Sequence, residues 1–264
     1  MIEPIIFIFT GIFTGITAGL FGLGGGLIIV PVVTYSLISF SNIPLDQAIL
    51  IGISTSLASI VITGAMAFYT HTKNKNIDFK IIHKFLIGIV LGSLIIGYII
   101  NIFPGQILKN FFIIYTFFVA YTIYNHKANF INNYVITNNF ASNSVGFIFS
   151  IISGLVGIGG ATLFVPFLIK NNIPAKLAIG TSSALGLLIG LGASISIFIS
   201  SLYFEPINNN MFGFLYLPAI LFITLPGLIF VRLSANWLLK ISDAKVKKLF
   251  SSMLIIIGLS MLLN

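Results

Sequence analysis

The sequence predicts an all-α integral membrane protein made of two inverted repeats, each a glycine-broken helical hairpin plus three transmembrane helices. Three observations lead to this prediction: the composition, a duplicated glycine motif and the placement of the basic residues. Over 264 residues, 58% of the side chains are apolar and only 7% are charged, and the mean hydropathy is +1.12. A water-soluble fold of this size cannot bury so large an apolar share.

Apolar segments long enough to span a bilayer follow one another along the whole chain. A span needs about 20 apolar residues. Such segments lie near residues 5–40, 47–70, 81–103, 106–124, 144–169, 177–203, 211–231 and 247–263, which leaves no room for a separate soluble domain. No Lys or Arg precedes Lys73, so the chain lacks the basic region of a signal peptide and we expect the first segment to be retained.

One glycine-rich stretch occurs twice and interrupts an apolar segment in each half. Residues 18–31 read AGLFGLGGGLIIVP and residues 153–166 read SGLVGIGGATLFVP, with seven of fourteen positions identical. A lone stretch of this kind often only lets membrane helices pack closely. Two matching copies instead indicate the broken helices that form the binding site of a secondary transporter.

The features that follow each glycine stretch keep the same order. An Ile-Pro pair comes next in both halves, and then a run of three hydroxyl residues, at 54–56 and at 181–183. We therefore predict a first transmembrane repeat over residues 1–124, a polar inter-repeat loop over residues 125–143 and a second transmembrane repeat over residues 144–264.

The basic residues favour a particular orientation of the chain. If each glycine-broken segment crossed the membrane once, the 13 Lys and Arg would divide nearly evenly between the two sides. If each is a hairpin that returns to its starting side, every one except Lys109 falls on the same side, as the positive-inside rule prefers. Each half then crosses the membrane an odd number of times, so the second repeat is inverted and both termini lie outside the cytoplasm.

Several other chemistries are disfavoured. The chain contains no Cys, which excludes thiolate chemistry, and its three His lack metal-ligand spacing, so we expect neither a metal nor a cofactor. The net charge of +8 sits in short loops rather than on one folded face, so we expect no nucleic-acid partner. The sequence has no HExxH, GxSxG or Walker motif and places no carboxylate pair at membrane depth, which argues against an enzyme.

The duplicated glycine stretch and its proline, together with residues 178–182 (AIGTS) and the weaker Thr55-Ser56, resemble the TauE/SafE family of sulfite-exporter-like membrane transporters. The resemblance covers nearly the whole chain. It implies a multi-pass carrier in the plasma (inner) membrane for small sulfur-containing or carboxylate anions such as sulfite, sulfoacetate or related sulfonates. One departure is Ala161, which stands where the first copy has Gly26 and predicts a tighter or differently aimed second turn.

A small anion that leaves water needs hydrogen-bond donors, and few charged side chains are available at membrane depth. Broken helices offer backbone N–H groups, and glycine lets the backbone approach the anion closely. We define residues 22–26 as the first tip and residues 157–161 as the second tip, and place the anion between them near the bilayer midplane. The candidate substrate-binding residues are Gly22, Gly24, Gly25, Gly26, Thr55, Ser56, Gly157, Gly159, Gly160, Thr181 and Ser182.

Alternatives remain open at this point. Each hydroxyl could simply bond back to its own helix. An anion channel would share the same site, and a carrier for another small carboxylate would share the same fold. The partners expected are a small anionic substrate and the lipid bilayer, and a homodimer is one of the assembly states that the sequence allows. The sequence does not choose the substrate, the transport direction or the coupling ion.

Overall fold

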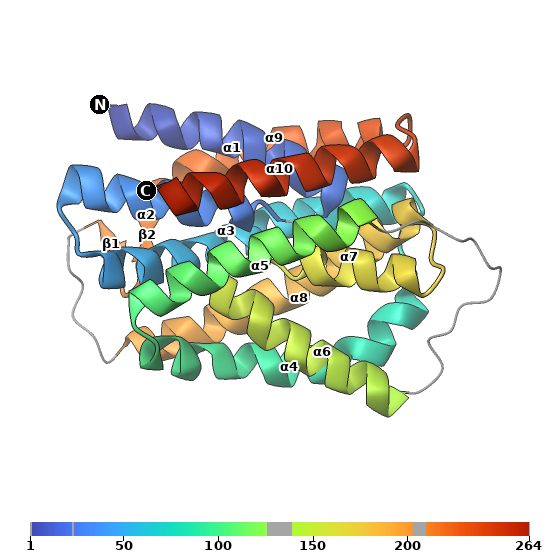
Figure 1. Cartoon of the computed structure of the whole chain (residues 1–264), viewed down its shortest axis with the longest axis horizontal. Helices are drawn as coiled ribbons and strands as arrows, with labels where there is room; N and C mark the ends of the chain where they lie inside the picture. Colours follow the sequence, from blue (N-terminus) through green and yellow to red (C-terminus); the bar gives the residue numbers. More distant parts are fainter. Residues whose placement is uncertain (1, 23, 126–138, 203–209, 264) are drawn as a thin grey trace.

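The computed structural model describes residues 2–22, 24–125, 139–202 and 210–263, and the elements of the first half are all helical (Figure 1). Helices α1 and α2 are separated by the first tip, and three further α-helices and one short 3₁₀ helix follow before residue 126. They are α1 (Ile2–Phe21), α2 (Gly26–Ser41), α3 (Leu45–Lys73), α4 (Phe79–Ile99), the short 3₁₀ helix η1 (Ile100–Ile102) and α5 (Gly105–Asn125).

The second half repeats this order with one addition. Helices α6 and α7 flank the second tip, and a two-stranded antiparallel ribbon precedes the helix that follows α8. The elements are α6 (Asn139–Val156), α7 (Ala161–Lys170), α8 (Ala175–Ser201), β1 (Met211–Phe212), β2 (Leu215–Tyr216), α9 (Leu217–Leu238) and α10 (Asp243–Leu263). The predicted loop of residues 125–143 lies mostly outside the described residues, and α6 begins at Asn139, before the predicted start of the second repeat.

Six helices in the described part of the chain are long and apolar enough to cross a membrane: α1, α3, α4 with η1, α6, α8 and α9. Their outward surfaces carry large exposed apolar side chains, such as Ile87, Leu91 and Ile229. The prediction of an all-α multi-pass membrane protein is therefore confirmed.

Hydrogen bonds between distant elements define two ends of the bundle. At the end that holds both termini, which we call the terminal end, Tyr216 Oη donates to Glu3 Oε1 (3.0 Å) and Gly105 N donates to Asp46 Oδ1 (2.7 Å). Helices α1, α3, α5 and α9 all begin there.

At the opposite end, which we call the basic end, Asn74 Nδ2 donates to Asn236 Oδ1 (3.0 Å) and Lys176 Nζ donates to the Leu239 carbonyl (2.9 Å). Helices α3 and α9 end there, and α8 begins there. The Lys and Arg of the described residues lie at or within about two turns of this end, except Lys109 near the start of α5. Lys127 lies outside the described residues.

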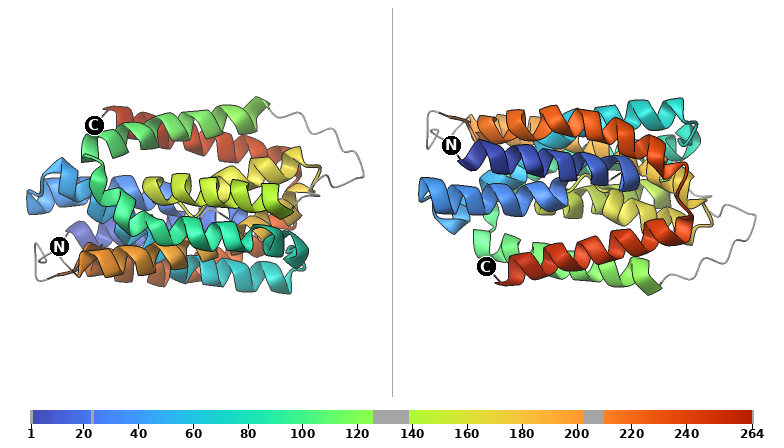
Figure 2. Two further views of the ribbon diagram at one scale, coloured as in Figure 1. Left: turned by 90° about the horizontal axis from the view of Figure 1, so that it is seen from below. Right: turned by 90° about the horizontal axis from the view of Figure 1, so that it is seen from above.

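Both glycine-broken segments turn back on themselves, from opposite ends of the bundle (Figures 1 and 2). Helix α2 runs back to the terminal end, where α1 began. Helix α6 runs beside α4 and in the same direction, because Gly88 N donates to Asn143 Oδ1 (2.9 Å) and Gly92 lies against Phe147 one turn further on. Helix α7 then returns to the basic end. A two-fold relation between the two halves stays a prediction.

A glycine stripe packs α1 tightly on α9 and thereby positions the first tip. A methyl group added at Gly11, Gly15 or Gly19 would lie within 2.6 Å of a backbone oxygen of α9. Small residues four apart let two membrane helices approach closely. The stripe ends at Gly19, three residues before the chain leaves the helix at Gly22.

Candidate functional site

The backbone of both tips adopts conformations that glycine is needed to reach. Gly22 has φ 71° and its counterpart Gly157 has φ 75°, while Gly25 has φ 89° and its counterpart Gly160 has φ 75°. Side chains with a Cβ disfavour this left-handed region. Two of the identical glycine pairs are thus needed at matching points of the two turns, whereas Gly24 has φ 66° and its counterpart Gly159 does not have a positive φ.

Each tip ends in a helix whose first N–H groups lack a side-chain cap. Gly25 caps α2 and Gly160 caps α7, and neither cap uses a side-chain hydrogen bond. The first N–H groups of a helix have no partner within the helix, and the helix dipole makes this end attractive to an anion. The structure places one such end at each tip, inside the bundle.

The two tips touch. A methyl group added at Gly26 would lie 2.3 Å from the Gly157 carbonyl oxygen, so the start of α2 rests directly on the second tip. Ser56 of α3 donates its hydroxyl hydrogen to the same carbonyl (2.7 Å). Gly159 lies beside Gly186 of α8, where an added methyl group would meet the Gly159 oxygen at 2.0 Å.

Helix α3 fixes both tips through two hydroxyls on one face. Ser56 binds the second tip, and Thr63 donates to the Gly24 carbonyl of the first tip (2.9 Å). Seven residues separate the two, which is two helical turns and places them on the same face. The Ser56 hydroxyl has one hydrogen and donates it to the Gly157 carbonyl, so Ser56 positions the second tip. Thr63 was not among the predicted site residues, although its spacing of seven residues from Ser56 was a usable signal in the sequence.

The predicted threonines each hold the start of a helix in the other half. Tyr216 N, just before α9, donates to Thr55 Oγ1, and Asp78 N, just before α4, donates to Thr181 Oγ1, both at 3.0 Å. Thr55 and Thr181 are fully buried. Because each hydroxyl acts as an acceptor in these bonds, each still has its own hydrogen to donate.

Ser182 differs from its neighbours. Its side chain is fully buried, and its hydroxyl has no hydrogen-bond partner among the described residues. Ser183, one position further, donates back to the Gly180 carbonyl (2.7 Å). Ser182 is therefore the one predicted hydroxyl that the described part of the protein leaves wholly free.

Two buried polar groups near the end of α1 were absent from the predicted site. The His71 side chain is fully buried beside Gly19 of α1. The side-chain nitrogen of Asn76 is also buried without a partner in the described part of the chain. Both residues lie next to polar loop positions in the sequence, so only the packing of α1 and α8 shows that they are inside.

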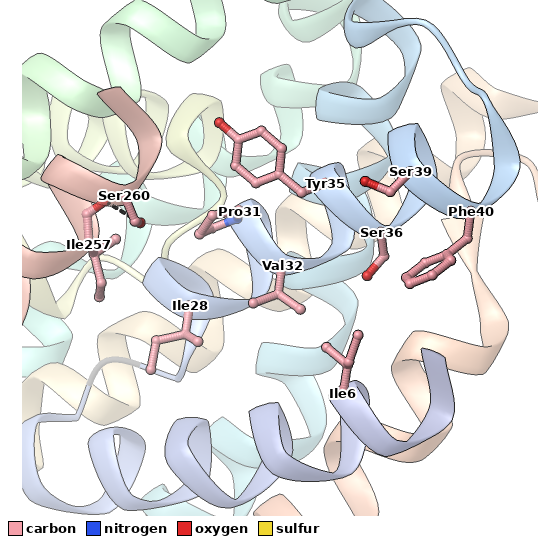
Figure 3. Close-up of a pocket in the computed structure, with 10 residues that line it drawn as sticks. All are labelled: Ile6, Ile28, Pro31, Val32, Tyr35, Ser36, Ser39, Phe40, Ile257 and Ser260. Atoms are coloured by element: carbon pink, nitrogen blue, oxygen red, sulfur yellow. Dashed lines mark hydrogen bonds between the residues drawn. The ribbon is translucent and has the colours of Figure 1, made fainter. Parts of the chain in front are cut away.

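An open pocket of about 440 Å³ leads along α2 toward the first tip (Figure 3). It lies between α1, α2 and α10, and its lining extends from Phe40 near the terminal end to Ile28, the third residue of α2. Its walls are apolar apart from the hydroxyls of Tyr35, Ser36, Ser39 and Ser260.

Charges near the site are few. The described residues include no cluster of three or more His, Cys, Asp or Glu side chains that could hold a metal ion. At the terminal end, burial and the adjacent Glu3 carboxylate raise the pKa of Tyr216, which keeps its hydroxyl protonated and donating to Glu3. Neutral donors therefore dominate the surroundings of both tips.

Paired broken helices that meet inside a bundle of membrane helices define a membrane transporter rather than an enzyme. The chain belongs to the sulfite exporter TauE/SafE family, whose family model matches residues 7–261.

Relatives from three organisms resemble the chain along most of its length. A probable membrane transporter protein of Haemophilus influenzae is 31% identical over 96% of both chains. One of Methanocaldococcus jannaschii is 29% identical over 98% of this chain and 95% of its own. One of Bacillus subtilis is 28% identical over 74% of this chain and 78% of its own. No solved structure matches the chain.

Proposed function

We propose that the protein is a secondary transporter that exports small sulfur-containing or organic anions, such as sulfite, sulfoacetate or related sulfonates, across the plasma membrane. The observation that carries the proposal is the contact between the two tips, where α2 and α7 begin with uncapped N–H groups beside Gly26 and the Gly157 carbonyl. Two positive helix ends that converge inside an apolar bundle suit a small anion. The description of the family supports a sulfur oxyanion as the substrate.

The donors proposed for the anion differ in how they act. The N–H groups at the starts of α2 and α7 approach the anion directly, and Ser182 adds a free hydroxyl. The hydroxyls of Thr55 and Thr181 accept hydrogen bonds from backbone N–H groups, so each can still donate its own hydrogen to the anion. Ser56 and Thr63 position the tips by donating their hydroxyl hydrogens to the Gly157 and Gly24 carbonyl oxygens.

The pocket along α2 is the proposed route between the terminal end and the first tip. Its lining is apolar with scattered hydroxyls and carries no charged side chain. An anion on such a route would have to keep part of its water shell, because apolar walls offer no hydrogen bonds in exchange, and the scattered hydroxyls are the donors that it would meet. At the other end, the clustered Lys of the loops would raise the local concentration of anions.

Two alternatives share this geometry: an anion channel, and a carrier for another small carboxylate. A carrier must change conformation in every cycle, so it saturates with substrate and shows counterflow, whereas a channel does not need alternating access. Selectivity between sulfonates and simple carboxylates would distinguish the proposed carrier from a carrier for another small carboxylate.

The test is counterflow with purified protein in liposomes. Liposomes loaded with unlabelled sulfite, sulfoacetate or acetate are diluted into the same labelled anion, and transient accumulation of label is measured. We expect accumulation with sulfite or sulfoacetate, and none in liposomes without protein. Flux that does not saturate and shows no counterflow would identify a channel. Accumulation with acetate alone would move the substrate class to carboxylates.

A further inference from the structure

A groove on the outer surface of α4 and α6, far from the two tips, combines basic and apolar walls. At the basic end it is an open pocket of about 720 Å³ whose lining includes Lys80, His83 and Lys84 of α4. A second open pocket of about 440 Å³ continues from it along the same two helices, since Ile87 and Asn143 line both. The walls of this second part are mainly apolar. We call the two parts together the α4–α6 groove.

The floor of the groove is a close contact between two helices that both begin at the basic end and lie side by side (Figure 1). A methyl group added at Gly88 would meet the Asn143 backbone oxygen at 1.9 Å, and one added at Gly92 would meet the Phe147 backbone oxygen at 2.6 Å. Because these glycines bring the two backbones together, the larger side chains on either side form the walls. The groove therefore follows the seam between α4 and α6 from the membrane surface inward.

One face of α4 changes from charged to apolar along the groove. Lys80, Lys84, Ile87 and Leu91 are three or four residues apart, so they lie on the same face. The candidate span Phe79–Ile102 has 24 residues and is about 36 Å long, which exceeds the hydrocarbon core of about 30 Å. The two lysines in its first turns thus reach the lipid headgroups. Ile87 and Leu91 are 64% and 54% exposed and face the acyl chains.

The carboxylate nearest to these lysines in the sequence is used inside the protein. Asp78 immediately precedes α4, and its side chain accepts a hydrogen bond from Lys80 N (2.8 Å) as the cap of that helix. No Asp or Glu is among the described residues that line the groove. Two like charges one turn apart on a helix repel each other, and an anion held between them offsets that repulsion. The lysine pair therefore favours an anionic occupant.

The seam between α1 and α9 offers a comparison, because it is packed on glycines in the same way. Helix α9 begins at Leu217, and its first four turns carry no Lys, Arg or His. Exposed apolar side chains such as Leu221 and Leu225 line its outer surface without a charged end. The combination of a basic entrance and an apolar seam is thus a feature of α4 and α6, and lipid-facing helices do not require it in general.

We propose that the α4–α6 groove binds one anionic diacyl phospholipid, with its phosphate at Lys80 and Lys84 and an acyl chain along Ile87 and Leu91. The ammonium groups donate charge-assisted hydrogen bonds to the phosphate oxygens, and the His83 ring adds an N–H donor. Basic pockets between membrane helices bind anionic headgroups in this way. A zwitterionic lipid carries the same phosphate together with an ammonium group that the lysines repel. The bound lipid joins α4 to α6, the helix that leads into the second tip.

The first test measures the unfolding temperature of the purified full-length protein in detergent. A ligand that binds only the folded state raises this temperature. We expect phosphatidylglycerol to raise it, and phosphatidylcholine or inorganic phosphate to leave it nearly unchanged. The Lys80→Gln, Lys84→Gln double variant should lose the shift. The matched control is Lys240→Gln, Lys245→Gln, which removes two exposed lysines at the same end but outside the groove and should keep the shift.

The second test leaves both lysines in place, so it holds even if their double variant fails to fold. Trp237→Phe removes the only Trp, and Ile148→Trp then places a fluorophore in the apolar part of the groove, at a side chain that is 52% exposed. In liposomes, we expect phosphatidylglycerol with brominated acyl chains to quench this Trp more strongly than brominated phosphatidylcholine. The control is Leu221→Trp in the same background, at a lipid-facing position of similar exposure on α9, where the two lipids should quench equally.

Three results would each overturn the lipid site. They are equal thermal shifts with phosphatidylglycerol and phosphatidylcholine, a phosphatidylglycerol shift that survives in the Lys80→Gln, Lys84→Gln variant, and equal quenching of Ile148→Trp by the two brominated lipids. A shift with inorganic phosphate as large as that with phosphatidylglycerol would also overturn it, because the groove would then bind a free anion. None of these readouts depends on the transported substrate, so the proposed function stands or falls separately.

Discussion

Residues of the same type have different roles around the tips, and only their partners distinguish them. Ser56 donates to the Gly157 carbonyl, Thr55 accepts from Tyr216 N, and Ser182 has no described partner. The sequence could identify this group of hydroxyls because they recur after each glycine stretch. It could not assign their roles, because partners such as Gly157 lie about a hundred residues away.

Ser182→Ala should weaken anion binding and leave the fold intact. The substitution removes one donor and leaves no described group without its partner, since the hydroxyl has none. The loss of a hydrogen bond to a charged partner costs about 1–3 kcal/mol, or roughly five- to 150-fold in affinity. Calorimetry with sulfite and sulfoacetate on the purified protein measures the change.

Ser183→Ala is the matched control, because that hydroxyl bonds back to its own helix at the Gly180 carbonyl. We expect its affinity to stay near that of the wild type. Equal affinities for Ser182→Ala and the wild type would exclude the Ser182 hydroxyl from the anion site.

At the scale of elements, the apolar segments and the glycine breaks were predictable, while local irregularities were not. The long runs of apolar residues predict the membrane helices, and the paired glycines predict the turns at Gly22–Gly25 and Gly157–Gly160. The ribbon of β1 and β2 was missed, because its strands of two residues each lie at the start of an apolar run. Helix α6 begins earlier than predicted, because its first turns are polar and pack on α4.

Gly26→Ala should separate the tips. The new methyl group would lie 2.3 Å from the Gly157 carbonyl oxygen, which is backbone and cannot rotate away. At the matching point of the second tip, Ala161 is fully buried and accommodated, so the requirement for glycine is particular to the first tip. We expect a lower unfolding temperature and loss of counterflow, measured by thermal shift in detergent and by flux in liposomes.

Gly64→Ala gives the control on α3. Its added methyl group would meet its nearest neighbours, in Ile60 and Leu187, at 3.7 Å, which is ordinary contact. Replacing a helical glycine by alanine usually stabilises a helix by about 0.5–1 kcal/mol, so its unfolding temperature should hold or rise. A Gly26→Ala protein that is as stable and active as Gly64→Ala would show that contact between the tips is not required.

At the scale of the molecule, the two halves are linked by reciprocal contacts. Thr55 of the first half holds the start of α9, and Thr181 of the second half holds the start of α4. The second tip is held by Ser56 of the first half. The separate halves could be predicted from the duplicated sequence. Their mutual dependence could not, since each of these contacts joins residues more than a hundred positions apart.

The arrangement of the ends predicts how the molecule sits in the membrane. Lys75 follows α3 at the basic end and Lys245 lies in the first turn of α10 at the same end, so the positive-inside rule places both in the cytoplasm. Asn101 is exposed in η1, after α4 has run to the terminal end, and should face the other side.

The chain has no native Cys, so Lys75→Cys, Lys245→Cys and Asn101→Cys each introduce a single site for a membrane-impermeant thiol reagent. In intact cells only Asn101→Cys should be labelled, and the other two should react after the membrane is permeabilised. Labelling of positions 75 and 245 from opposite sides would contradict the hairpin topology, which requires α3 to end and α10 to begin on the same side of the membrane.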